Sequence, residues 1–362
     1  MTRRVACLLP AAGRGLMVAV AAVAVLALSA SVGRGQGIQI ASGQQGRLRA
    51  DRVRYDARAQ VLLAEGNVHL TIGTLVLRSS RLRLEQKTLL AFAEGSVSVR
   101  QPEFSLEAGR VRYDIRRRSA RAEGGAVLAQ GGVAVRAVQI AFELEAQTVA
   151  ASGGVVVTQG ASTLTGVSLR ANLKTSEANV FGDAHLVRAA PAGAAASGSQ
   201  DTQDAAIRAA HLRIRWGAVN EAEAEGSVIV RQGSIAARAQ RARYSETAGR
   251  LVLEGEVVVA QFGDKEVTAG VTLTADQLVV LLRERDMEAS GKVTVTQKGR
   301  TATGERGTYN EKEKRIILTG HVQMQDEEGN VIRADKVVID LEAETFDASG
   351  DVETTFKVKR GK

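Results

Sequence analysis

The chain lacks most of the residue types around which catalytic and metal sites are built. Its 362 residues include one cysteine, Cys7, three prolines and only 3% aromatic residues. Beyond Cys7 there is therefore no disulfide, no thiolate nucleophile and no cysteine-based metal site. The histidines His69, His185, His211 and His321 have no metal-ligand spacing, and neither a P-loop nor a nucleophile-elbow motif occurs. We expect no enzyme activity, no catalytic residue, no metal and no cofactor.

Long hydrophobic runs are absent too, with one exception near the N-terminus. Residues 16–28 carry no charge, follow Arg3, Arg4 and Arg14, and precede a group of small residues. This order is typical of a secretory signal peptide, and the run is shorter than the roughly 20 residues of a membrane span. We expect residues 1–35 to be a signal peptide that directs the protein to the periplasm, with an uncleaved inner-membrane anchor as the alternative.

Glycine, by contrast, is abundant and regularly placed. The 37 glycines include ten that begin a motif with apolar residues at the second and fourth following positions. Five of these are 29 residues apart, and the same spacing returns in the second half of the chain. Such a period indicates a repeat architecture. The ten glycines are Gly66, Gly95, Gly124, Gly153, Gly182, Gly226, Gly255, Gly291, Gly320 and Gly350.

A second feature keeps phase with the glycines and identifies the repeat as β-structure. A large apolar residue stands eleven positions earlier and is often followed by an acidic residue, as in Tyr55-Asp56 and Tyr113-Asp114. Both features alternate with period 2, which is typical of strands, and the acidic residue is turn chemistry. Each unit is predicted to hold a glycine strand and a longer strand that ends at this pair. His69, His185 and His321 occupy outward positions in this alternation and are expected to be solvated.

One such unit cannot bury its own apolar face, so the units must stack. The pattern predicts two facing sheets or one rolled sheet. If each unit gives one strand to each sheet, a unit lengthens the stack by roughly 4.8 Å. Residues 189–205 are small, polar and unpatterned, and are predicted to form a linker between domains at 36–188 and 206–362. The end strands are open edges that invite pairing with another chain.

Two segments carry a resemblance to a known family. Residues 50–56, Ala-Asp-Arg-Val-Arg-Tyr-Asp, lead to Ala-Glu-Gly-Asn-Val at 64–68, and residues 334–340 begin a similar copy. This pattern resembles the OstA-like lipopolysaccharide-transport family, which includes LptA and the N-terminal domain of LptD, over residues 45–357. The resemblance implies an elongated open β-jellyroll of two facing antiparallel sheets, built here from about ten stacked two-strand units. It also implies a bridge between inner and outer membranes that shields lipid acyl chains.

The implied partners are lipopolysaccharide or a similar glycolipid, other Lpt-type bridge components and, through edge strands, further copies of the chain; nucleic acid is not expected. Arg116, Arg117 and Arg118 are candidates for an anionic headgroup, with a solvated turn as the alternative. They lie in the more basic half, since residues 36–188 carry 20 basic and 13 acidic side chains. The lipid-groove candidates are Val53, Tyr55, Val68, Leu70, Val97, Val99, Val111, Tyr113, Val155, Val157, Val228, Val230, Val257, Val259, Val293, Val295, Val322 and Met324.

A different function is compatible with the same pattern. A closed sandwich with an ordinary aliphatic core would make the chain a structural β-repeat scaffold or filament of the cell envelope, without lipid cargo. The Val, Leu and Ala of the inner positions suit either a packed core or an incompletely filled groove.

Overall fold

The computed structural model describes residues 46–189, 205–215, 220–232, 235–261, 270–284, 286–343 and 345–356, apart from 103, 131 and 144. The predicted signal peptide and residues 190–204 of the predicted linker lie outside these ranges. Throughout the described ranges the regular structure is strand, which confirms the predicted all-β fold. A search of the same ranges finds no helix with the length and apolar character needed to cross a membrane.

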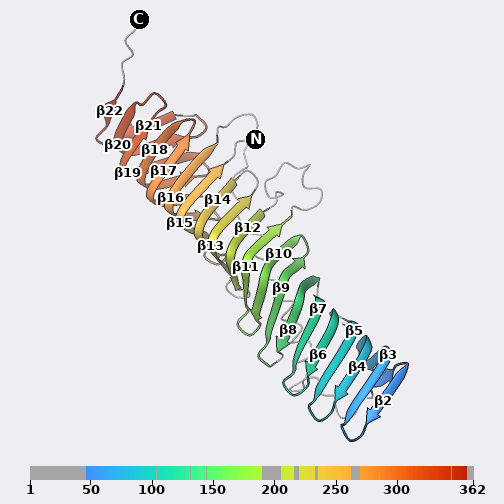
Figure 1. The fold of residues 1–362 in the computed structure, drawn as a ribbon. Coiled ribbons are helices and arrows are strands. Elements are labelled where there is room, and N and C mark those ends of the chain that lie inside the picture. The colour runs from blue at the N-terminus through green and yellow to red at the C-terminus, as the bar shows by residue number, and fades with distance from the viewer. Residues whose placement is uncertain are drawn as a thin grey trace. The chain divides into compact units, whose positions relative to one another are not determined.

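The strands follow one another in chain order, and every described pairing is antiparallel (Figure 1). The first eleven are β1 (Arg47–Arg49), β2 (Arg52–Asp56), β3 (Val61–Ile72), β4 (Leu75–Glu85), β5 (Leu90–Gln101), β6 (Phe104–Asp114), β7 (Ser119–Gln130), β8 (Val133–Glu143), β9 (Thr148–Gln159), β10 (Ser162–Asn172) and β11 (Glu177–Arg188). The others are β12 (Ala205–Arg215), β13 (Glu221–Gln232), β14 (Ile235–Ser245), β15 (Arg250–Gln261), β16 (Val271–Leu281), β17 (Met287–Gln297), β18 (Arg300–Asn310), β19 (Arg315–Gln325), β20 (Val331–Asp340), β21 (Thr345–Ser349) and β22 (Glu353–Thr355).

The chain divides into two compact units. The N-terminal unit contains residues 14–186 and 213–218, and the C-terminal unit contains residues 187–212 and 219–362. The predicted boundary at the linker falls on residues that the structure does not describe, so the extent of each domain stays a prediction. Each unit is a ladder of neighbouring strands, and each is described by itself below.

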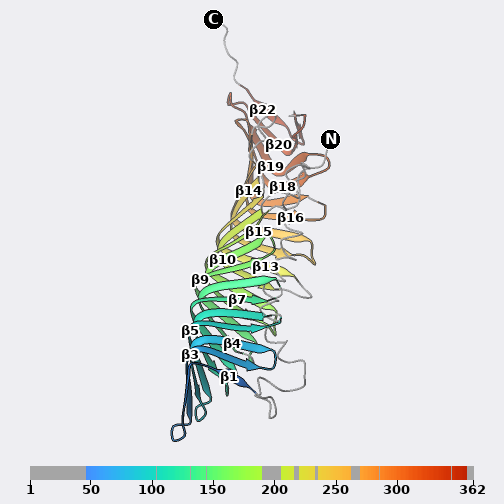
Figure 2. The same cartoon turned by 90° about the vertical axis from the view of Figure 1, so that its right-hand side faces the viewer.

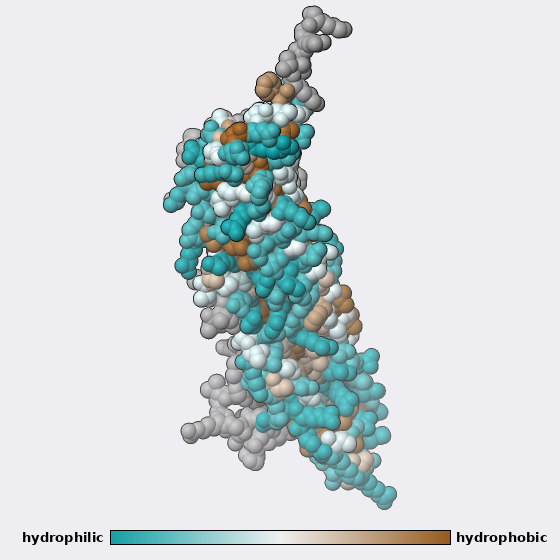
Figure 3. Space-filling view, turned by 90° about the vertical axis from the view of Figure 1, so that its left-hand side faces the viewer, coloured by the Kyte–Doolittle hydropathy of each residue, from teal (hydrophilic) through white to brown (hydrophobic). Residues whose placement is uncertain are grey.

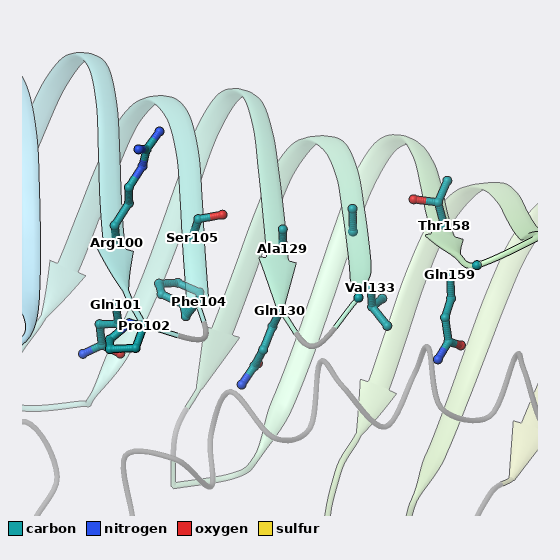
Figure 4. A pocket seen from close by; sticks show the side chains of 13 residues that line it. Arg100, Gln101, Pro102, Phe104, Ser105, Ala129, Gln130, Val133, Thr158 and Gln159 are labelled. Atoms are coloured by element: carbon teal, nitrogen blue, oxygen red, sulfur yellow. The ribbon is translucent and has the colours of Figure 1, made fainter.

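The repeat glycine lies in the middle of its strand, where it bends the strand. Gly66 and the residue after it, Asn67, both have positive φ, at 74° and 46°, and the register to β4 shifts between Glu65 and Val68. The same pair of left-handed residues recurs in the repeats, for example at Gly95 and Ser96. It forms a β-bulge, which locally bends a strand. The bulges of successive strands line up into a crease, and the strands arch over it (Figures 2 and 4).

This crease changes one expectation about the strands. The two strands of each unit are confirmed, but both lie side by side in one sheet, and each crosses the crease. The two facing layers are therefore the two halves of a bent sheet, and one repeat advances the ladder by two strand spacings, roughly 9.6 Å. The strand that ends at the aromatic–acidic pair is not the longer one, because β4 has 11 residues and β3 has 12.

The acidic residue after the aromatic one caps a tight turn, as its chemistry predicts. Asp56 Oδ1 accepts hydrogen bonds from the backbone N–H of Arg58 and of Ala59, both at 2.9 Å. Asn172 and Asp340 hold the turns after their strands in the same way. Because the capping side chain replaces a backbone partner, these turns need no glycine at their centres.

Candidate lipid groove

The inner face of the N-terminal unit carries an unbroken row of large aliphatic side chains four residues beyond the crease glycines. Each member is the cross-strand partner of the next, from β3 to β10. We call it the aliphatic row. Its members are Leu70, Leu77, Val99, Leu106, Leu128, Val135, Val157 and Leu164.

On the other side of the crease the inner residues alternate in size. Glycine strands contribute alanine and the return strands contribute Leu, Val or Ile, as in Ala64 opposite Leu82 and Ala122 opposite Ile140. These four side chains are buried. In the C-terminal unit, Gly307 shows how close the two halves come near the crease, since a Cβ there would lie 3.1 Å from Val293 and 3.2 Å from Leu318. The strip next to the crease is thus filled by the protein itself.

The eighteen groove candidates all lie on strands, but their exposure differs. The valines two residues after a glycine are all buried: Val68, Val97, Val155, Val228, Val257, Val293 and Val322. Four residues after the glycine, Val157, Val230, Val295 and Met324 are buried, whereas Leu70, Val99 and Val259 are half-buried. Val111 and Tyr113 are half-buried as well. Val53 and Tyr55 pair with Ala64 and Leu62 of β3, but both are 51% exposed because β2 is an end strand.

The basic cluster lies on the turn between β6 and β7. Arg117 approaches Asp114 at 4.0 Å, and Arg118 approaches Glu145 at 4.0 Å. Arg116 is exposed and makes no ion pair within the described residues. An anion would therefore meet one uncompensated guanidinium here and two that already have carboxylate neighbours.

Within the described residues no group of histidine, cysteine and acidic side chains is arranged to hold a metal ion. His321 is solvated as expected, with its side chain 94% exposed, and its Nδ1 lies 2.9 Å from Glu305 Oε1. His69 and His185, in contrast, are half-buried, because neighbouring side chains of the outer face cover them. Residues 326–330 form a hairpin turn, in which Asp326 accepts two hydrogen bonds of 2.8 Å from Asn330.

Two of the repeat tyrosines have perturbed phenols. Burial raises the pKa of the Tyr113 hydroxyl, whose oxygen has no hydrogen-bond partner within the described residues. Burial, together with a 2.8 Å hydrogen bond donated to Glu311, raises the pKa of Tyr309. Both hydroxyls therefore stay neutral at physiological pH, so neither adds a charge to the inner face.

A hollow of ≈ 910 Å³ opens at the strand ends of the N-terminal unit, where the hairpins join β5 to β6, β7 to β8 and β9 to β10. It is bordered by aliphatic residues and by glutamines, among them Gln130 and Gln159 (Figure 4). The sequence analysis did not single out these glutamines, although their spacing of 29 residues was visible in the chain. The visible outer face is mainly hydrophilic, with separate small hydrophobic patches (Figure 3).

Comparison with known proteins places these features in a family. The family model described as "LptA/(LptD N-terminal domain) LPS transport protein" matches residues 47–177 and 134–276. A model described as "Lipopolysaccharide-assembly, LptC-related" matches residues 227–327. The comparison with curated proteins gives no match.

Among solved structures, the chain is similar to LptH, the LptA-homologous periplasmic component of the lipopolysaccharide transport device of Pseudomonas aeruginosa. The identity is 19%, the TM-score is 0.31, and the alignment covers 34% of this chain and 95% of that one. No argument rests on a likeness of this size. The family models span more than half of the chain, and the chain belongs to the LptA/LptD N-terminal domain family of lipopolysaccharide-transport proteins.

Proposed function

We propose that this protein carries lipopolysaccharide, or a similar glycolipid, through the periplasm as a non-enzymatic bridge component between the inner and outer membranes. The acyl chains would lie against the inner face of the bent sheet. The observation that carries the proposal is the aliphatic row, which continues over eight strands with no polar member.

The energetics of such a row suit transport. Burial of one methylene group contributes about 0.8 kcal/mol, so a fully covered chain of ~12 carbons gains roughly 10 kcal/mol. This gain is non-directional, and successive members of the row offer nearly equivalent surfaces. A chain that slides from one repeat to the next exchanges one set of contacts for another, and no position along the row becomes a deep trap.

The experiment that tests the proposal places a photo-crosslinking amino acid in the chain in growing cells. At Val99 or Val230, on the inner face, we expect capture of a glycolipid. The matched controls are the preceding residues, Ser98 and Ile229, whose side chains point to the opposite face. Capture that is equal at inner and outer positions, or absent at both, would reject the lipid groove.

A structural scaffold remains the second candidate, and one observation favours it. The valines next to the crease, such as Val257 and Val293, are already fully buried without any cargo. A scaffold predicts stable assembly in the absence of lipid. Polymerisation of protein from which all lipid has been extracted would support it over the transport proposal.

A further inference from the structure

Glutamine recurs on the inner face just beyond the aliphatic row. Gln101, Gln130 and Gln159 each stand six residues after a crease glycine and are 29 residues apart. The strand register links them through the facing residues Phe104 and Val133, in the order Gln101, Phe104, Gln130, Val133, Gln159. Cross-strand partners share one face of a sheet, so the three carboxamides face the same side as the aliphatic row. We call this set the glutamine row.

Two of these side chains have buried amide atoms with no partner. Gln130 is 6% exposed, and neither its Oε1 nor its Nε2 makes a hydrogen bond within the described residues. Oε1 of Gln159 is also buried without a partner. Buried polar groups of native proteins are nearly always hydrogen-bonded, so each exception calls for an explanation. Both side chains border the hollow at the strand ends (Figure 4).

The free groups define the chemistry of what would bind there. A carboxamide offers one acceptor oxygen and two N–H donors and carries no charge. At Gln130 both functions are unused. The cation that borders the hollow, Arg100, lies 3.4 Å from Glu107 and is thus compensated. A ligand that both donates and accepts, without net charge, satisfies Gln130 best.

We propose that the hollow binds a neutral donor–acceptor group of an amphiphile, a secondary amide or a hydroxyl, at the junction between its acyl chain and its headgroup. The order of residues along the strand fits such a molecule, since Val97 and Val99 come first and Gln101 follows at the strand end. The acyl chain lies on the aliphatic row, and the amide or hydroxyl lies on the glutamine row. This inference rests on the proposed lipid function and adds the part of the lipid that is recognised.

The test compares two probes that differ in one group. A pyrene-labelled dodecanoic acid is used as its N-methylamide, which donates and accepts, and as its methyl ester, which only accepts. Binding to the full-length protein is followed by pyrene fluorescence. We expect the amide to bind about tenfold more tightly, which corresponds to ~1.4 kcal/mol. In the double variant Gln130→Met, Gln159→Met the preference falls to about onefold, while binding of the ester persists.

Gln325→Met, on an exposed side chain of β19, is the matched control and keeps the tenfold preference. The thermal midpoint of Gln130→Met should not fall, because an apolar side chain of similar length replaces an unpaired amide. A preference that survives in the double variant, or a wild type that binds both probes equally, overturns this inference and leaves the lipid groove intact. A wild type that binds neither probe contradicts the lipid groove itself, and the inference with it.

Discussion

At the scale of single residues, the bend of each strand uses two left-handed positions, of which only the first requires glycine. The second position holds a side chain in most repeats, such as Asn67, Ser96 and Asp183, with φ between 46° and 52°. At the first position a Cβ would collide with the residue that packs over the crease from the neighbouring strand. At Gly95 it would lie 2.5 Å from Ser80 Oγ. The 29-residue period of glycine therefore records a steric contact as well as a backbone angle.

This account predicts different costs for two adjacent glycines. A Cβ on Gly153 would lie 2.5 Å from Val138 Cβ, whereas a Cβ on Gly154 meets nothing within 4 Å, although both have positive φ. Gly154→Ala should cost about 1 kcal/mol of unfolding free energy, from backbone strain alone. Gly153→Ala should cost about 3 kcal/mol, because overpacking adds to the strain. Urea denaturation of the two variants measures the difference, and equal costs would show that the steric contact is unimportant.

A carboxylate in the C-terminal unit makes stability depend on pH. Glu254 on β15 accepts hydrogen bonds of 2.5 and 2.6 Å from Arg243 on β14 and one of 3.2 Å from Gln277 on β16. The Arg243 guanidinium, above all, holds the pKa of this carboxyl below its ordinary value of 4.5. A depressed pKa stabilises the fold above the ordinary value, and the contribution disappears as the pH falls through the folded-state pKa.

Glu254→Gln should therefore lower the unfolding free energy at pH 7 by about 0.5 to 1 kcal/mol, a modest effect because the pair is partly exposed. The difference from wild type should shrink as the pH is lowered below 4.5. Denaturation curves at pH 7, 5 and 3 provide the check. A difference that grows toward acid pH would contradict the assigned role of the arginine.

At the scale of elements, the repeat is a pair of adjacent strands with its own bends and its own capped turn. Strand period, turn chemistry and the phase of the glycines could be predicted from the sequence, because each depends on residues close together in the chain. That both strands of a pair cross one crease could not, because alternation places residues on a face but does not report that the strand bends. The glutamine row was missed for another reason: an unpaired amide is recognised only when its surroundings are known.

Removal of one whole repeat should be tolerated. Deletion of residues 95–123 joins Glu94 to Gly124 and keeps every strand direction, every bulge and the alternation intact. The shortened protein should show the same β-type circular dichroism per residue and a cooperative melt, because each repeat contacts mainly its neighbours. Deletion of residues 95–109 removes about one strand and reverses the direction of all that follow. That variant should fail to fold, and equal folding of both would refute the two-strand repeat.

At the scale of the whole molecule, the ends of the strand ladders matter most for assembly. β2 pairs only with β3 among the described strands, and its residues Val53 and Tyr55 are 51% exposed. An edge of this kind is a template for another strand. The double variant Val53→Lys, Tyr55→Lys should weaken head-to-tail self-association, because charge at an edge opposes pairing. Sedimentation velocity over a concentration series measures this effect, and unchanged association would place the contact elsewhere.

The central claim is that the inner face holds lipid, and native mass spectrometry of the protein purified from its own cell envelope tests it most directly. We predict a population whose mass exceeds that of the polypeptide by one amphiphile with acyl chains. The extra mass should be lost when Val99 and Leu128 of the aliphatic row are both changed to Asp. Protein that carries no lipid from a lipid-rich envelope, yet assembles normally, would contradict the account and favour a structural scaffold.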